Sequence, residues 1–205
     1  MSLKESRRKT QMMVVTALFA AIIVALQFIP IPPIAGVPIT LSLVPIVLSA
    51  VLYGPIQGAV LGALMGVAII FQIFLRPDLA GPLTMTMYTF SPFATMLLCV
   101  VKSALAGYLA GVVAKWLSSV NRTLGVVVAS AICPIVNTGI FMAGVFAIFK
   151  EPLSTWVSAN TESASLAAFM FAVILIGNFL PELILNIVVS PVIVRVSEIV
   201  KKSNK

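Results

Sequence analysis

The chain has 205 residues, of which 60% are hydrophobic and only 9% are charged, and its mean hydropathy is +1.15. Soluble domains carry about 25% charged residues, so this composition excludes a water-soluble globule and predicts an integral membrane protein. The net charge is +7 and histidine is absent, which disfavours metal-dependent and hydrolytic chemistry because histidine is the commonest metal ligand and general base.

The apolar residues form six long runs separated by short segments rich in Pro, Gly and charged residues. Their approximate ranges are 12–29, 37–52, 56–75, 92–117, 124–149 and 166–196. A helix needs about 20 apolar residues to span a bilayer, and the second run is the shortest, so we expect a helix that is tilted, broken or covered by its neighbours. The sequence predicts an all-α fold: one transmembrane domain of six helices over residues 1–205.

The basic start leads directly into the first run, and no small-residue cleavage site followed by a soluble chain appears, so we expect a retained helix. Residues 1–11 and 197–205 are expected to be basic cytoplasmic tails. With the N-terminus inside, the following ten basic residues fall on the cytoplasmic side: Lys4, Arg7, Arg8, Lys9, Lys115, Arg122, Arg195, Lys201, Lys202 and Lys205. The outer side then holds only Arg76 and Lys150, which predicts that both termini are cytoplasmic.

The expected outer connections, around 31–37, 76–91 and 150–165, are longer than the inner ones. Long loops on one face commonly carry function, so we predict an external binding face. Tyr88 and Trp156 lie on these connections and are simply explained as membrane-interface anchors. Arg76 and Lys150 could attract an anion there.

Small residues recur at every fourth position in three runs: Ala17, Ala21 and Ala25; Gly58, Gly62 and Gly66; and Gly107 and Gly111. This spacing places them on one helix face, where another helix can approach closely. We expect ordinary packing within the chain for the glycines. For the alanines, packing within the chain and docking of another protein are both open.

Two ionisable residues, Lys102 and Glu182, fall near mid-depth in the fourth and sixth runs. Such residues are costly in a bilayer and usually face a partner or a cavity. Asn137 and Thr138 are central in the fifth run, and Asn178 shares a helix face with Glu182. Two interpretations stay open: a buried Lys102–Glu182 ion pair that holds the bundle together, or a pocket for a polar solute.

Several motifs of other functional classes are missing. The sequence contains no Gly-rich phosphate loop followed by Lys-Ser/Thr, no nucleophile elbow and no His-Glu-x-x-His. Cys99 and Cys133 both lie inside apolar runs, where they are expected to act as small buried hydrophobes. We therefore expect a binding protein that is not an enzyme, has no cofactor or metal of its own, and depends on other subunits for energy.

Over nearly its whole length the chain resembles the substrate-binding S components of energy-coupling factor vitamin transporters. The resemblance rests on the size, the six helices, the alanine face, the run LSLVPIVL at 41–48 with Tyr53-Gly54-Pro55 after it, and the glycine-spaced third run. It implies that Ala17, Ala21 and Ala25 dock a transmembrane coupling subunit, which works with two cytoplasmic ATPases. It also implies a high-affinity vitamin site near the outer side, and release by reorientation of the subunit in a bacterial plasma membrane.

The segment PIVNTGIF at 134–141 is similar to the pantothenate-specific members. Pantothenate is a small anion with two hydroxyls and an amide, so it needs a cation and several neutral polar partners. Lys102 or Arg76 could meet the carboxylate, and Glu182 would then orient Lys102 or be protonated. The substrate-binding candidates are two cations, one carboxylate and four neutral polar groups: Lys102, Arg76, Glu182, Asn137, Thr138, Asn178 and Tyr88.

Other functions stay open. The same mechanism could serve another vitamin such as folate or riboflavin, although the scarcity of Tyr and Trp in the last three runs argues against ligands that need stacking. A standalone secondary transporter could use Lys102 and Glu182 as an ion or proton relay. In a purely structural membrane subunit the two residues would merely pair. The positive charge needs no nucleic-acid partner, because it follows the expected cytoplasmic bias.

Overall fold

The computed structural model describes residues 3–29 and 41–203, and this part of the chain contains helices and no strand. The elements in chain order are α1 Leu3–Phe28, α2 Leu43–Tyr53, α3 Pro55–Leu75, α4 Pro77–Ala80, α5 Pro82–Phe90, α6 Pro92–Leu117, α7 Arg122–Ile148, α8 Lys150–Asn160, α9 Leu166–Phe169, the π-helix η1 Met170–Phe179 and α10 Leu180–Ser203. The predicted all-α fold is confirmed. The outer connection expected at 31–37 and the start of the second run lie outside the described residues.

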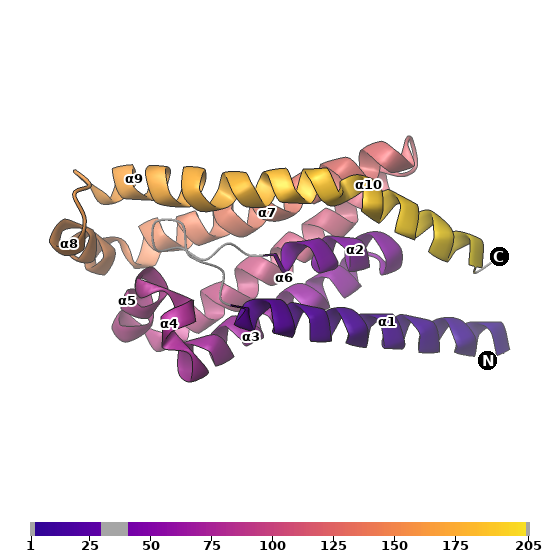
Figure 1. Cartoon of the computed structure of the whole chain (residues 1–205), viewed down its shortest axis with the longest axis horizontal. Helices are drawn as coiled ribbons and strands as arrows, with labels where there is room; N and C mark the ends of the chain where they lie inside the picture. Colours follow the sequence, from indigo (N-terminus) through magenta and orange to yellow (C-terminus); the bar gives the residue numbers. More distant parts are fainter. Residues whose placement is uncertain (1–2, 30–40, 204–205) are drawn as a thin grey trace.

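Five helical stretches of the described chain are long and apolar enough to cross a membrane: Thr10–Phe28, Pro55–Leu75, Pro92–Leu117, Arg122–Ile148 and Leu166–Val200. They correspond to the first, third, fourth, fifth and sixth predicted runs. The start of α1 and the end of α10 lie at the same end of the bundle, and α4, α5 and α8 lie at the opposite end (Figure 1). This arrangement suits a chain whose termini share one side of the membrane, which stays a prediction.

The second run forms a short helix that is enclosed by the others. The 11 residues of α2 extend for about 16 Å, roughly half of a bilayer's hydrocarbon thickness. Leu43, Ile46 and Val47 are fully buried, and α2 contacts α1, α3, α6, α7 and α10. A helix too short to span the lipid is thus covered by its neighbours, as expected from its length.

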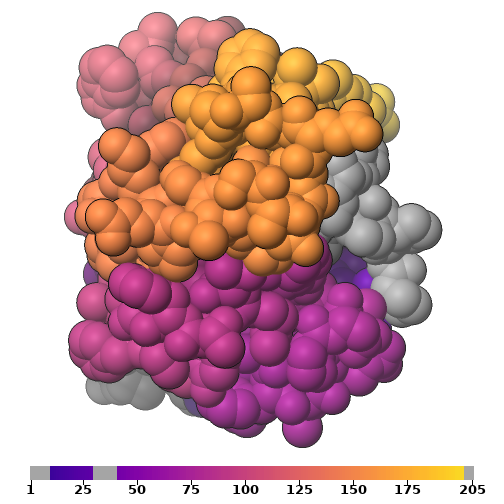
Figure 2. Space-filling model, turned by 90° about the vertical axis from the view of Figure 1, so that its left-hand side faces the viewer, coloured from indigo at the N-terminus to yellow at the C-terminus, as the bar shows by residue number. Residues whose placement is uncertain are grey.

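The two longest described outer connections are mostly helical, which corrects their description as loops. Prolines begin α4 and α5 at Pro77 and Pro82, where the missing N–H costs no intrahelical bond. Gly81 separates them with a φ of 79°, which a residue with a side chain rarely adopts. Figure 2 views this end of the molecule, where atoms of α5 and α8 meet. The expected outer face is therefore a layer of short helices.

The glycine stripes join α3 to α6, the most extensively packed helix pair. A Cβ added to Gly66 would lie 2.5 Å from the Cα of Val100, and one added to Gly62 would collide with the backbone of Ser103. On the other side, a Cβ at Gly111 would lie 2.5 Å from the Cα of Pro55. Backbones this close leave no space for side chains. The expectation of packing within the chain is confirmed.

Candidate functional site

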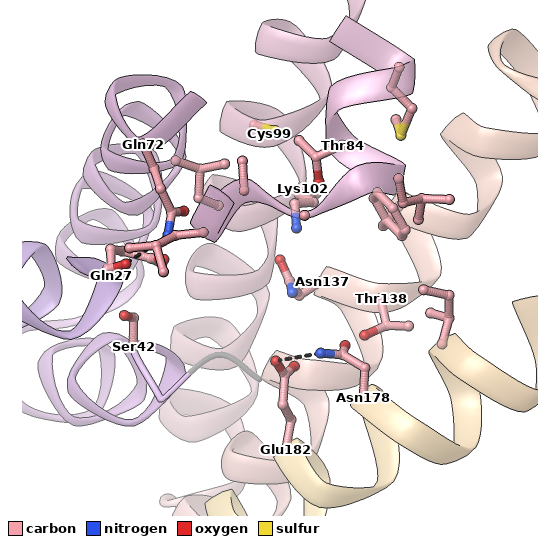
Figure 3. A pocket seen from close by; sticks show the side chains of 18 of the residues that line it. Gln27, Ser42, Gln72, Thr84, Cys99, Lys102, Asn137, Thr138, Asn178 and Glu182 are labelled. Carbon is pink, nitrogen blue, oxygen red and sulfur yellow. Dashed lines mark hydrogen bonds between the residues drawn. The ribbon is translucent and has the colours of Figure 1, made fainter. Parts of the chain in front are cut away.

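A pocket of about 160 Å³ opens between the long helices, next to the short helices α4 and α5. Residues of α1, α3, α6, α7, η1 and α10 line it, together with Ser42 just before α2 (Figure 3). The α4–α5 segment contributes a largely apolar rim that includes Leu83 and Met87. The pocket therefore lies at the end of the bundle opposite the two chain ends.

The structure brings five of the seven predicted site residues into this pocket: Lys102, Asn137, Thr138, Asn178 and Glu182. They come from four different helical segments, α6, α7, η1 and α10. Arg76 and Tyr88 are not among the lining residues. Arg76 is paired with Asp78, and the Tyr88 ring packs edge-on against Phe74 with 5.7 Å between the ring centroids.

Lys102 interacts with an aromatic ring. Its ammonium lies over Phe141, 5.1 Å from the ring centroid, a favourable cation–π geometry. In the described part of the chain, Lys102 and Glu182 form no ion pair, and the ion pair found there joins Arg76 to Asp78. The Lys102 side chain points into the pocket in Figure 3. The ammonium is thus held in place while its charge stays available to the cavity.

Glu182 and two asparagines form a polar row along the sixth predicted run. Glu182 is 1% exposed, and its Oε1 accepts a hydrogen bond of 3.4 Å from Asn178 Nδ2. Asn186 Nδ2 donates to the Glu182 backbone oxygen over 2.8 Å. Asn178 belongs to the π-helix, a rare conformation that recurs at functional sites. The sequence pattern predicted Asn178 as a site residue but not this helix type.

Asn137 is the polar centre of the α7 side of the pocket. Its Oδ1 accepts a hydrogen bond of 3.5 Å from Ser103 Oγ on α6, and the residue lines the cavity. Thr138 follows on the same helix and is 5% exposed. Figure 3 shows Asn137 between Lys102 and Glu182 in this view. This side of the pocket offers both donors and acceptors to a polar ligand.

Polar residues from the first half of the chain complete the pocket, and they were not among the residues predicted from the sequence. Gln27 of α1, Ser42 and Gln72 of α3 all line it. Gln72 Nε2 donates to the Gln27 backbone oxygen over 2.8 Å, and Ser42 Oγ donates to the Ile23 oxygen over 3.5 Å. The sequence does contain a signal that could have revealed them. Gln27 and Gln72 are polar residues near the predicted outer ends of the first and third apolar runs.

Asp78 carries the rim's negative charge. Arg76 donates to both of its carboxylate oxygens, at 3.0 Å from Nε and 2.8 Å from the second nitrogen. These hydrogen bonds lower the pKa of Asp78 and raise that of Arg76. Since the side chains are 50% and 60% exposed, solvent screens the pair. At neutral pH the positive charge of Arg76 is therefore balanced by the charge of Asp78, and Arg76 lies outside the pocket.

Comparison with known protein families matches residues 11–194 to the model described as the ECF transporter substrate-specific component. Comparisons with curated proteins and with solved structures returned no match. The family match covers the five long apolar stretches except for Thr10 and the end of the last one. The chain therefore belongs to the substrate-specific components of energy-coupling factor transporters, and it is a multi-pass protein of the cell membrane.

Proposed function

We propose that this chain captures a vitamin from outside the cell for an energy-coupling factor importer, and that the vitamin is pantothenate. The observation that carries the proposal is the composition of the pocket. One ammonium, from Lys102, shares it with the amides of Asn137 and Asn178 and the hydroxyl of Thr138. A small anion with hydroxyl and amide groups can satisfy each of these partners, which a buried ligand must do to bind tightly.

In the proposed complex, the carboxylate of pantothenate meets Lys102, which is the cation among the described lining residues. The hydroxyls and amide meet Asn137, Thr138 and Asn178. Glu182 serves as an acceptor for a ligand hydroxyl, in addition to its hydrogen bond from Asn178. Phe141 is the aromatic ring among the described lining residues, and its face is occupied by Lys102, which disfavours ligands that require stacking.

The proposed partners are a transmembrane coupling subunit and two cytoplasmic ATPases, which would supply the energy of ATP. Ala17, Ala21 and Ala25 are exposed along α1, so a helix of the coupling subunit could approach there without moving other side chains. Small exposed residues permit close backbone packing in lipid. This supports an alanine docking face on α1.

The first experiment is calorimetric titration of the purified, detergent-solubilised chain with a panel of vitamins, beginning with pantothenate. One-to-one nanomolar binding of pantothenate, and much weaker binding of its alcohol analogue pantothenol, would support both the capture function and the carboxylate assignment. If the chain binds a different vitamin, the assignment to pantothenate is wrong, but the capture function still stands.

Absence of binding by a folded sample would reject the proposal of a capture subunit. Because Lys102 and Glu182 share the pocket, the competing function is ion-coupled transport by this chain alone. Uptake into liposomes that contain only this protein, driven by a proton or sodium gradient, would establish it.

A further inference from the structure

The side chain of Gln27 has a buried donor without a partner. Its Nε2 is inaccessible to solvent and makes no hydrogen bond, although the residue lines the pocket. Buried polar atoms in folded proteins are nearly always paired, because an unpaired donor forfeits its hydration. Because solvent does not reach this nitrogen in the structure, the end of the Gln27 side chain must rotate to meet a ligand acceptor in the pocket, and pairing of the donor would favour that rotation.

The backbone of Gln27 is anchored at the end of α1. The helix ends at Phe28, so the carbonyl groups of its last turn lack partners within the helix. Gln72 of α3, which is 6% exposed, donates its Nε2 to the Gln27 oxygen over 2.8 Å. Figure 3 shows the two glutamines together on the side of the pocket formed by α1 and α3. Gln72 thus positions Gln27 without occupying its side-chain nitrogen.

Gln27 lies at the end of the inner face of α1. Phe19 and Ile23 precede it at intervals of four residues, and they are 9% and 0% exposed. The exposed residues Ala21 and Ala25 are each offset by two positions from this face, which corresponds to about 200° around a helix. One side of α1 therefore leads to the pocket, and the opposite side carries the alanine face.

The first helix is also the least embedded of the membrane-spanning helices. Within its most apolar stretch, 11% of the residues are buried, compared with 33–44% in the other four spans of the described chain. A helix with so few buried contacts can shift relative to the bundle at low energetic cost. Any additional bond at its pocket end would limit that movement.

We infer that Gln27 is a ligand-binding residue, which donates a hydrogen bond from α1 to an acceptor oxygen of the bound substrate. The inference rests on the proposed capture function and extends its site from the second half of the chain to the first. For pantothenate, we assign Gln27 to the carbonyl oxygen of the amide, which leaves the amide N–H and the hydroxyls to Asn137, Thr138 and Asn178, and the carboxylate to Lys102. The bound ligand then links α1 to the helices on the opposite side of the pocket, so occupancy restrains the helix that carries the alanine face.

The test compares pantothenate titrations of the wild type, Gln27→Leu and Gln57→Leu. Gln57 is the matched control because it also joins α3 to α1, through Thr16 at 3.5 Å and Met12 at 3.7 Å, and it does not line the pocket. We expect Gln27→Leu to weaken binding about tenfold, the size of one lost neutral hydrogen bond, and Gln57→Leu to leave it unchanged. Gln27→Glu should weaken binding further, because it replaces the donor with a negative charge.

Equal affinity of wild type and Gln27→Leu, with matched size-exclusion profiles and melting temperatures, would overturn the role of Gln27 and leave the capture function standing. If the wild type binds no vitamin, the capture function itself fails, and the inference falls with it.

A second measurement addresses α1 directly. Hydrogen–deuterium exchange should show that saturating pantothenate slows exchange of the amides at 22–28 in wild type and Gln57→Leu, and much less in Gln27→Leu. The same protection in Gln27→Leu would mean that the ligand does not act on α1 through this residue.

Discussion

The ammonium of Lys102 lies 5.1 Å from the centroid of the Phe141 ring, on a neighbouring helix of the same pocket. This contact joins α6 to α7 and holds a positive charge beside Asn137 and Thr138. An ammonium bound to an aromatic face keeps its charge, unlike one that is neutralised by a carboxylate. The relationship therefore prepares Lys102 to receive an anionic group.

Removal of this charge tests the carboxylate assignment. We expect Lys102→Gln to weaken pantothenate binding by about 10- to 100-fold, since a hydrogen bond to a charged group contributes about 1.5–3 kcal/mol. Lys115→Gln is the control, because Lys115 is an exposed cation in the last turn of the same helix. Calorimetry measures both affinities. Similar affinities for the two variants would show that Lys102 does not meet the carboxylate.

Arg76 is the competing cation, and we expect Arg76→Gln to change the affinity less than twofold. Its guanidinium is paired with Asp78 and lies outside the pocket lining. The pKa of Asp78 is lowered in the folded protein, so the pair's stabilisation is present above the ordinary carboxyl pKa and is lost as the pH falls through the lowered value. Between pH 6 and 8 the pair stays ionised, and affinity should not vary through it. A large loss of affinity in Arg76→Gln would indicate that the ligand carboxylate binds at the rim, near Arg76, and not at Lys102.

Two substitutions separate the effect of the negative charge of Glu182 from the effect of its hydrogen bond. Glu182→Gln keeps an acceptor for Asn178, which donates over 3.4 Å, and removes a negative charge from the pocket. We expect pantothenate to bind this variant as tightly as wild type or more tightly. Glu182→Leu removes the acceptor as well, and loss of the hydrogen bond that Asn178 donates to it should lower stability by about 1–3 kcal/mol. Thermal unfolding and titration separate the two effects. Loss of affinity in Glu182→Gln would show that the ligand needs the negative charge.

The α3–α6 contact should tolerate no added methyl group. A Cβ on Gly62 would collide with the backbone of Ser103, so Gly62→Ala must push the two helices apart. We expect it to destabilise the protein by about 1–3 kcal/mol. Gly139→Ala is the control, because a Cβ there meets no atom within 4 Å. Melting temperatures of the two variants in one detergent provide the comparison, and equal values would contradict the close contact.

The alanine face can be tested separately from ligand binding. Ala21→Leu places a bulky side chain on the exposed face of α1, and we expect it to weaken association with the coupling subunit roughly tenfold or more. Val188→Leu is the control, since Val188 is 67% exposed on α10. Co-purification with the coupling subunit measures docking, while pantothenate titration checks that the pocket is intact. Unchanged docking of Ala21→Leu would place the interface elsewhere.

Much of the fold could be read from local patterns. In lipid, a spanning segment must satisfy its own backbone hydrogen bonds, so a long apolar run becomes a helix wherever it occurs. The limits of α6 at Pro92 and Leu117 agree with the fourth predicted run, and the glycine spacing identified the faces that pack. The helices α4, α5 and α8 were missed because short amphipathic segments carry little periodic signal.

The sequence by itself determined the membrane class and the long helices, since each is encoded in residues close together in the chain. It also singled out the polar residues now found on α6, α7, η1 and α10, but it left a buried ion pair and a shared pocket both open. Only the tertiary structure decided that Gln27, Ser42 and Gln72 join this group, that Lys102 contacts Phe141 rather than Glu182, and that Arg76 lies outside. These relationships depend on how each helix is rotated and tilted against its neighbours. That orientation is a property of the packed bundle. Lipid solvates every apolar face of a helix equally well, so side-chain packing between helices determines which face turns inward.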